Sequence, residues 1–249
     1  MVLSDMLLFQ NNLGENFSLI NQIEGSGLDA NNEIEEPNLF SNSPYFENSE
    51  FVNFLTEKKH SFIIYSLNCQ SLNDKFDNLK VYIDTYNSLH ECEISAICLQ
   101  ETWLSEGSDP SLFQLEGYSL IHLGNSCSAH SGLAIYLNKA YQYEKVIVKD
   151  NSEVWDGLFI KVSIKNNVFL NKTIILGNIY RPPRLNLNNI NTFKNELTEI
   201  FDSLRVYDDV YITGDFNLDL LKFKENNGIN LFFEFMISNN FFFTNYSTN

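Results

Sequence analysis

The chain has 249 residues and a formal net charge of −16, from 32 acidic and 16 basic side chains. Its hydrophobic content is 44%, with 21 Phe and 12 Tyr, which is enough for one sizeable buried core. Such an acidic balance excludes a protein that attracts nucleic acid over its whole surface. Any role on nucleic acid must rest on a local basic face or on a bound metal ion.

The cysteines and the N-terminal residues indicate the cellular compartment of the protein. Cys69, Cys92, Cys98 and Cys127 show no metal-ligand spacing, and free cysteines are typical of reducing conditions. The first residues lack the basic and apolar regions of a signal peptide, and no apolar run reaches the length of a membrane span. We therefore expect an intracellular protein, nuclear or cytoplasmic, that is neither secreted nor membrane-bound. The sequence does not indicate an oligomeric state.

Residues 1–58 differ in composition from the rest of the chain. They are rich in Asn, Glu and Ser, and the first 60 residues carry 10 acidic side chains against two lysines. Their scattered apolar side chains follow no sustained period, which is typical of disorder. We expect a mostly disordered acidic leader over 1–58, with a short helix around 50–55, and one folded domain over 59–249.

The domain begins with a strand, a helix and a second strand. Residues 61–67 and 94–99 are continuous apolar runs, typical of strands buried on both faces. Between them a helix is predicted to start near Asn73, with apolar side chains at helical spacing as far as Tyr86. This order is that of a βαβ unit.

Short strands and two further helices make up the remainder. The predicted strands are residues 118–122, 132–137, 143–148, 158–164 and 173–180, and the dipeptides between them, Asp156-Gly157 among them, indicate turns. Next come a helix with an apolar stripe over 190–204, a strand over 210–213, a helix over 227–238 and a strand that begins at 241. The pattern predicts two layers of largely antiparallel strands with helices outside.

Polar residues follow four of the apolar runs, where open α/β sheets tend to place their sites. These polar ends are Asn68, Glu101, Tyr180-Arg181 and Asp215 with Asn217. Because strand side chains alternate between faces, Asp215 and Asn217 are expected to point the same way. Gly214 permits the sharp turn or close backbone approach that such a strand end needs.

The acidic member of this set suits a metal ion. Glu101 offers hard oxygen atoms to Mg²⁺, which takes few protein ligands and keeps several waters, with Mn²⁺ as an alternative ion. Asn68 is expected beside it, as a second metal ligand or as a contact to the phosphate. Bound Mg²⁺ polarises a phosphoryl oxygen and helps a leaving alkoxide to depart.

The other members suit a phosphate and an attacking water. Tyr180 and Arg181 supply a phenol and a guanidinium that bind phosphate oxygens. Asp215 would orient or activate the water, and Asn217 would donate to a phosphate oxygen. Together the residues predict a metal-assisted phosphodiesterase. Taken singly, each also fits a structural role, such as a turn cap at Asn68 or a rigid polyproline exit at 180–183.

The strings around these residues resemble the endonuclease/exonuclease/phosphatase superfamily. Those with Gln-Glu-Thr-Trp-Leu and Tyr-Arg-Pro-Pro are most similar to the apurinic-type endonuclease domain of LINE-like retrotransposons, which lack long terminal repeats. The resemblance covers residues 61–249 and rests on Ser66–Leu72, Cys98–Leu104, Ser131–Tyr136, Asn178–Pro183 and Gly214–Asn217.

The resemblance implies a four-layer α/β sandwich, two mostly antiparallel sheets flanked by helices, and Mg²⁺-dependent nicking of DNA to a 3′-hydroxyl. It implies that Glu101 is the principal metal ligand with Asn68 beside it. Tyr180 would contact the phosphate, and Asp215 and Asn217 would serve the water and the oxyanion.

The sequence departs from the family pattern after the Gly-Asp-Phe-Asn string. The family continues to an Ile/Leu-Asp strand and a closing Ser-Asp-His, and this sequence ends at Asn249 before either appears. We therefore expect a sandwich that is incomplete at the C-terminus and inactive as it stands. Two alternatives stay open: a phosphodiesterase of the same superfamily that acts on lipid or inositol phosphate, and a non-catalytic remnant that binds nucleic acid.

Overall fold

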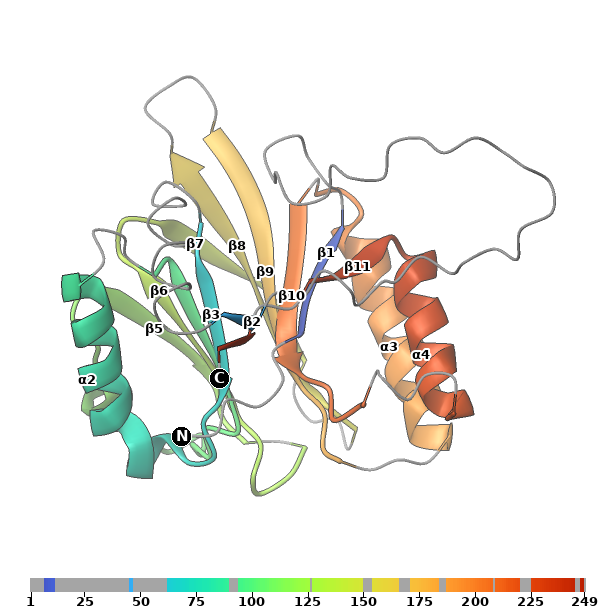
Figure 1. Cartoon of the computed structure of the whole chain (residues 1–249), viewed down its shortest axis with the longest axis horizontal. Coiled ribbons are helices and arrows are strands. Elements are labelled where there is room, and N and C mark those ends of the chain that lie inside the picture. The colour runs from blue at the N-terminus through green and yellow to red at the C-terminus, as the bar shows by residue number, and fades with distance from the viewer. Residues whose placement is uncertain are drawn as a thin grey trace.

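The structure is a computed structural model, shown in Figure 1. It describes residues 7–11, 45–46, 62–89, 94–125, 127–149, 154–165, 171–183, 187–207, 209–219, 225–244 and 247–248. The helix expected around residues 50–55 lies outside these ranges.

The described residues form strands, three α-helices and one short 3-10 helix. The helices are α2 (Leu72–Leu89), η1 (Pro110–Phe113), α3 (Leu187–Leu204) and α4 (Asn227–Ser238). The strands are β1 (Leu7–Asn11), β2 (Tyr45–Phe46), β3 (Ile64–Asn68), β4 (Ala96–Gln100), β5 (Tyr118–Leu123), β6 (Leu133–Asn138), β7 (Gln142–Lys149), β8 (Asp156–Lys165), β9 (Asn171–Tyr180), β10 (Asp209–Asp215), β11 (Phe241–Thr244) and β12 (Ser247–Thr248).

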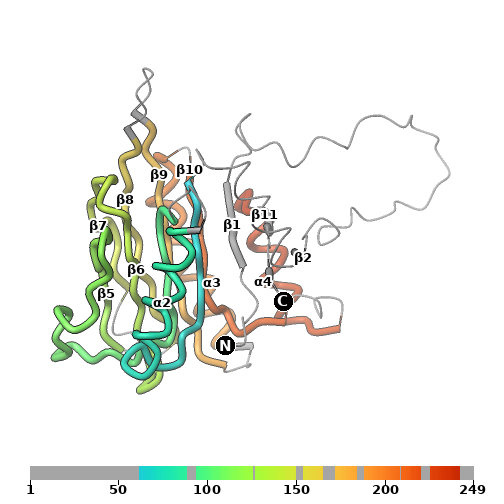
Figure 2. The backbone as a smooth tube through the Cα atoms, turned by 60° about the vertical axis from the view of Figure 1, so that its left-hand side comes forward, coloured from blue at the N-terminus to red at the C-terminus, as the bar shows by residue number. Residues whose placement is uncertain are grey.

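Most of these strands form two sheets. The large sheet has the order β11-β1-β10-β9-β8-β7, and the small sheet has the order β3-β4-β6-β5. Strands β7 to β10 run side by side across the large sheet (Figure 2). Within the two sheets only β3–β4 and β9–β10 are parallel pairs, and the other described pairs are antiparallel. A separate pair joins β2 to β12.

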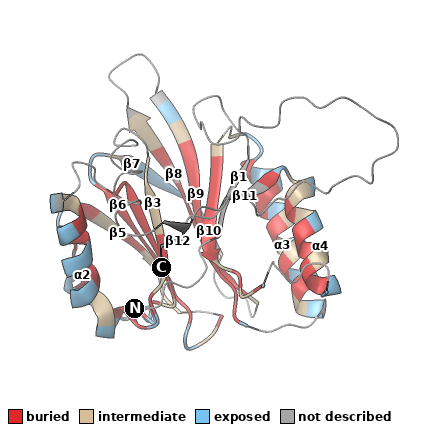
Figure 3. Ribbon diagram, in the orientation of Figure 1, coloured by how far each residue is buried: buried red, intermediate tan, exposed pale blue. Residues whose placement is uncertain are grey.

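One helix covers the outer face of the small sheet. Helix α2 buries Leu79, Ile83 and Tyr86 against the sheet. Many of its other residues are exposed (Figure 3). Its inward side chains recur at helical spacing, as the sequence predicts, and they pack against apolar side chains of β4 and β6.

Two helices cover the outer face of the large sheet. The predicted stripe of α3, from Ile190 to Leu204, is buried together with Phe232 and Met236 of α4. The Asn226 side chain accepts the backbone N–H groups of residues 228 and 229, which explains why α4 begins where the sequence predicts.

A third apolar layer lies between the sheets. Along β8, Leu158, Ile160 and Val162 face the small sheet, whereas Phe159 faces α3 and α4. Because side chains alternate between the two faces of a strand, β8 contributes to two apolar cores. The layers are helix, sheet, sheet and helices, which confirms the predicted four-layer α/β sandwich with mostly antiparallel sheets.

Two local expectations differ from the structure. Asp156 and Gly157 are the first two residues of β8 and do not form a turn, and a Cβ at Gly157 would collide with the Trp155 ring. Strand β3 is only half-buried over part of its length because it lies at the edge of the small sheet. An apolar run alone does not distinguish an edge strand from a central one.

Part of the expected leader belongs to the large sheet. Strand β1 pairs antiparallel with both β10 and β11, from Leu7 opposite Gly214 to Asn11 opposite Val210. Most of residues 1–58 lie outside the described ranges, so the leader and the boundary at 58/59 stay predictions. In the described part of the chain, no helix is both long and apolar enough to cross a membrane.

Candidate active site

The predicted polar residues follow the two parallel strand pairs. In the small sheet, β3 ends at Asn68 opposite Gln100 of β4, and Glu101 comes next. In the large sheet, β10 ends at Asp215 opposite Tyr180, the last residue of β9. Because parallel strands end at the same edge, each pair presents its polar residues together.

A hydrogen bond joins the two edges. The Asn68 side-chain nitrogen donates to Oδ2 of Asp215 over 2.8 Å, although 147 residues separate them in sequence. Asn68 Oδ1 in turn accepts the backbone N–H of Gln70 at 3.2 Å. The structure thus brings together polar strand ends from both sheets.

Glu101 and Tyr180 meet at the same place. Glu101 is half-buried, and its positive φ of 52° turns it out of the line of β4. Burial, and then the neighbouring Glu101 carboxylate, raise the pKa of Tyr180 above its ordinary value. The phenol therefore stays protonated and able to donate.

The Asp215 carboxylate is held by two donors. Its Oδ1 accepts the backbone N–H of Asn217 at 2.9 Å, and its Oδ2 accepts from Asn68. Burial raises the pKa of Asp215, and these two hydrogen bonds oppose that shift. The nearby Glu101 carboxylate raises the pKa of Asp215 further.

Arg181 lies buried beside the backbone that follows β10. Its side chain is 1% exposed and donates from Nε to the carbonyl of Phe216 at 2.8 Å and from a terminal nitrogen to the carbonyl of Asn217 at 3.0 Å. Burial lowers the pKa of Arg181 to about 10. In this structure Arg181 supports the backbone that follows β10, and its contact to a phosphate stays a prediction.

Asn217 also supports the backbone around the end of β10. Its side-chain nitrogen donates to the carbonyl of Arg181 at 2.8 Å, and its φ is 48°. An amide nitrogen has two N–H groups, so this contact leaves one donor that is compatible with the predicted contact to a phosphate oxygen.

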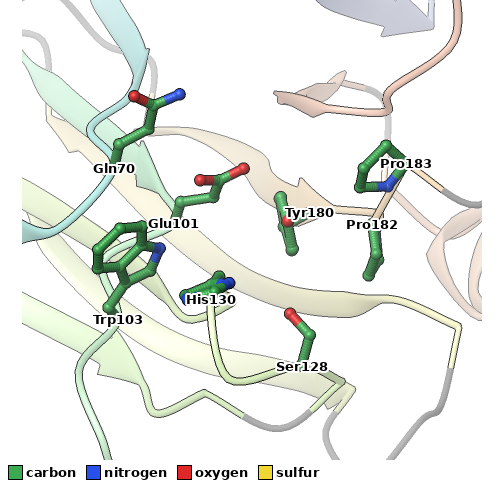
Figure 4. A pocket seen from close by; sticks show the side chains of 8 residues that line it. All are labelled: Gln70, Glu101, Trp103, Ser128, His130, Tyr180, Pro182 and Pro183. Atoms are coloured by element: carbon green, nitrogen blue, oxygen red, sulfur yellow. The ribbon is translucent and has the colours of Figure 1, made fainter.

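A pocket of about 380 Å³ opens beside Glu101 and Tyr180 (Figure 4). Trp103 and His130 lie on one side of it, and two prolines lie on the other. The lining consists of Gln70, Glu101, Trp103, Ser128, His130, Tyr180, Pro182 and Pro183. The sequence places Trp103 within a motif, but it gives no local signal that His130, from a different loop, would face it.

The oxygen atoms at this centre suit Mg²⁺. Two carboxylates, Glu101 and Asp215, lie close enough for one to raise the pKa of the other, and a cation would relieve that repulsion. Mg²⁺ binds through one or two carboxylates and keeps several waters. Among the residues that the structure describes, no three His, Cys, Asp or Glu side chains gather as a metal-binding group. The donor set fits a metal held by few protein ligands.

Solved structures of other proteins share this four-layer fold. An AP endonuclease, LMAP, from Leishmania major is similar with a TM-score of 0.56 and 15% identity, over 72% of this chain and 67% of that chain. A 3′-5′ exonuclease, NExo, from Neisseria meningitidis is similar with a TM-score of 0.51 and 18% identity, over 71% of this chain and 70% of that chain. No protein-family model matches the sequence, and no curated protein is significantly similar to it.

Proposed function

We propose that this chain carries the metal- and phosphate-binding residues of a Mg²⁺-dependent DNA endonuclease, of the kind that nicks DNA to a 3′-hydroxyl in LINE-like retrotransposons. The observation that carries the proposal is the hydrogen bond between Asn68 and Asp215, which unites the polar strand ends of both sheets beside Glu101. The similarity in fold to two nucleases supports the nuclease class. The Gln-Glu-Thr-Trp-Leu and Tyr-Arg-Pro-Pro strings support the retrotransposon type.

Each side chain takes a role that its contacts permit. Glu101 and Asn68 would hold the metal ion through their side-chain oxygens. The ion, when bound, polarises a phosphoryl oxygen and stabilises the departing alkoxide. Asp215, fixed by two donors, orients the water and accepts its proton. The Tyr180 phenol and the second N–H of Asn217 donate to phosphate oxygens.

We further propose that the 249 residues are almost inactive on their own, so that any cleavage is slow. In the superfamily, the closing Ser-Asp-His string supplies a residue that pairs with the water or the phosphate, and this sequence does not contain the string. The loss of one member of such a unit typically costs orders of magnitude in rate. Metal binding does not depend on that string, so it gives the sharper test.

The experiment measures Mn²⁺ binding by electron paramagnetic resonance, and nicking of supercoiled plasmid with protein in excess. We expect Glu101→Gln to weaken Mn²⁺ binding at least tenfold, and both Glu101→Gln and Asp215→Asn to abolish slow nicking. The matched control is Glu199→Gln, an exposed acid on α3, which should change neither.

Three outcomes would contradict parts of the proposal. Unchanged Mn²⁺ binding in Glu101→Gln would show that the metal assignment is wrong. Hydrolysis of phosphoinositide vesicles without nicking would indicate a lipid phosphodiesterase. DNA binding without nicking that survives Glu101→Ala and needs no Mg²⁺ would indicate a binding remnant.

A further inference from the structure

The pocket wall formed by Trp103 and His130 has no part in the roles assigned above. Trp103 is 39% exposed, although large aromatic side chains are usually well buried. Its ring centroid lies 4.8 Å from that of His130, with the ring planes inclined at 45°. Figure 4 shows this aromatic pair beside Glu101, on the side of the pocket away from Pro182 and Pro183.

The backbone conformation at Trp103, which exposes its ring, is strained. Its φ is 57°, in the left-handed region that non-glycine residues rarely adopt. Two hydrogen bonds fix the segment, from the Thr102 N–H to the carbonyl of Gly132 at 3.1 Å and from the Trp103 N–H to the carbonyl of Ser131 at 2.9 Å. A strained residue that is held so firmly while its ring faces solvent indicates a binding role.

The loop that carries His130 is also held by hydrogen bonds. Asp156 is fully buried, and its carboxylate accepts the backbone N–H groups of Cys127 at 3.1 Å and Gly132 at 3.5 Å, on either side of His130. The Ser131 hydroxyl donates to the carbonyl of Ser128 at 2.8 Å. The backbone that carries each ring of the pair is therefore held in place by hydrogen bonds.

The charge of the pocket limits what it can bind. In the described part of the chain its lining includes the Glu101 carboxylate and no lysine or arginine. Attraction of phosphate groups by charge is therefore weak here. Aromatic faces bind nucleobases by stacking, which needs no positive charge and tolerates any base.

We propose that Trp103 and His130 form a stacking platform for the nucleobase next to the scissile phosphate. The face of a base is accessible only when the base is unstacked, so the substrate is DNA with an unpaired nucleotide at that position, single-stranded or locally opened. This inference rests on the proposed function and names its substrate class.

Fluorescence gives a direct test without catalysis. The chain has two tryptophans, and Trp155 is fully buried with its indole N–H donating to Glu196, so only Trp103 reports on a ligand at the surface. The full chain in EDTA is titrated with a deoxyadenosine decamer and with a decamer of abasic units that carries the same phosphates. We expect the first to quench the emission and to bind about 5- to 150-fold more tightly, the range that stacking of one base gives.

Variants separate stacking from other effects, with binding followed by the anisotropy of labelled oligonucleotides. Trp103→Ala should remove the preference for the decamer with bases, and Trp103→Phe should retain it. The control Tyr143→Ala removes an aromatic of similar exposure, 41%, on the distant strand β7, and should behave as the wild type. Equal affinity of the wild type for both decamers, or a preference that survives Trp103→Ala, would overturn the proposal.

The same measurements distinguish this inference from the proposed function. Base-dependent quenching with unchanged Mn²⁺ binding in Glu101→Gln would leave the platform standing and refute the metal site. Mn²⁺ binding and nicking that depend on Glu101, without any base-dependent binding, would refute the platform alone.

Discussion

At the scale of single residues, the site depends on how closely two backbones approach. Gly214 has a φ of 152°, and a Cβ at this position would meet the carbonyl group of Ile179 on the parallel neighbour β9. Asp215 follows directly, so the approach sets where its carboxylate lies. The sequence predicts this need for glycine from its place at a strand end, although it does not identify the atom that is approached.

The close approach at Gly214 is tested by Gly214→Ala. We expect it to lower the free energy of unfolding by about 3 kcal/mol or more, because the new methyl group collides with backbone that cannot rotate away. Urea unfolding followed by circular dichroism measures the change. The control is Gly107→Ala, where nothing lies within 4 Å of the added Cβ and the change should stay within about 0.5 kcal/mol. Equal effects of the two substitutions would contradict the close approach.

Arg181 shows why a residue type does not fix a role. Its guanidinium suits phosphate, and the sequence alone favours that contact. In the structure the backbone after β10 turns its carbonyls toward the side chain, and the donors are used there. That turn depends on Asn217 donating back to the carbonyl of Arg181, a contact between segments 36 residues apart that no local pattern reveals.

At the scale of elements, strand β1 bears on the expectation that residues 1–58 are mostly disordered. Phe9 lies in the middle of β1, opposite Ile212 of β10 and Phe243 of β11. We expect Phe9→Pro to destabilise the protein, because proline removes a backbone donor and is excluded from the interior of a sheet. A loss of about 3 kcal/mol is expected, as for proline in other regular elements.

Thermal and urea unfolding of Phe9→Pro, compared with the wild type, measure this loss. A more exposed edge at β10 should also promote aggregation, which light scattering detects. If Phe9→Pro is as stable as the wild type, β1 does not contribute to the folded sheet and the expectation of a mostly disordered leader stands.

Most elements within the domain are predictable from sequence, whereas β1 is not. The helices α3 and α4 have apolar stripes that follow from local spacing alone, and α4 also has a side-chain cap. Strand β1 has only Leu7, Leu8 and Phe9 as an apolar run, and its partners lie about 200 residues away. Pairing over such a distance depends on the rest of the sheet, so no local signal marks it.

At the scale of the whole molecule, the candidate site requires a fixed alignment of the two sheets relative to each other. Asn68 and Glu101 come from the small sheet, and Tyr180 and Asp215 come from the large one. A buried polar group fixes this alignment from inside the apolar layer. The Gln100 side-chain nitrogen donates to Asn178 Oδ1 on β9 at 2.6 Å and to the Ser66 hydroxyl at 3.0 Å.

Asn178 completes the connection between the sheets. It is fully buried, and its side-chain nitrogen donates to the carbonyls of Leu99 at 3.0 Å and Ala134 at 3.1 Å, in two different strands of the small sheet. An apolar pair would fill the same space, but it would allow the sheets to slide. Buried hydrogen bonds are directional, so they select one register.

The substitution Asn178→Ala tests this connection between the sheets. Asn178→Ala should lower the free energy of unfolding by about 3 kcal/mol, because it removes three hydrogen bonds and leaves the Gln100 nitrogen with fewer partners in the core. Asn188→Ala, at an exposed position of α3, should change it by no more than about 0.5 kcal/mol.

A double-mutant cycle with Gln100→Ala isolates the contact between the two side chains, and we expect a coupling of about 1 kcal/mol. Mn²⁺ binding should weaken in Asn178→Ala under conditions where the protein is still folded, since the distance between the two strand ends is then less tightly set. Strictly additive stabilities with unchanged Mn²⁺ binding would show that apolar packing alone aligns the sheets. In that case the geometry of the site would be set by the Asn68–Asp215 contact rather than by the core beneath it.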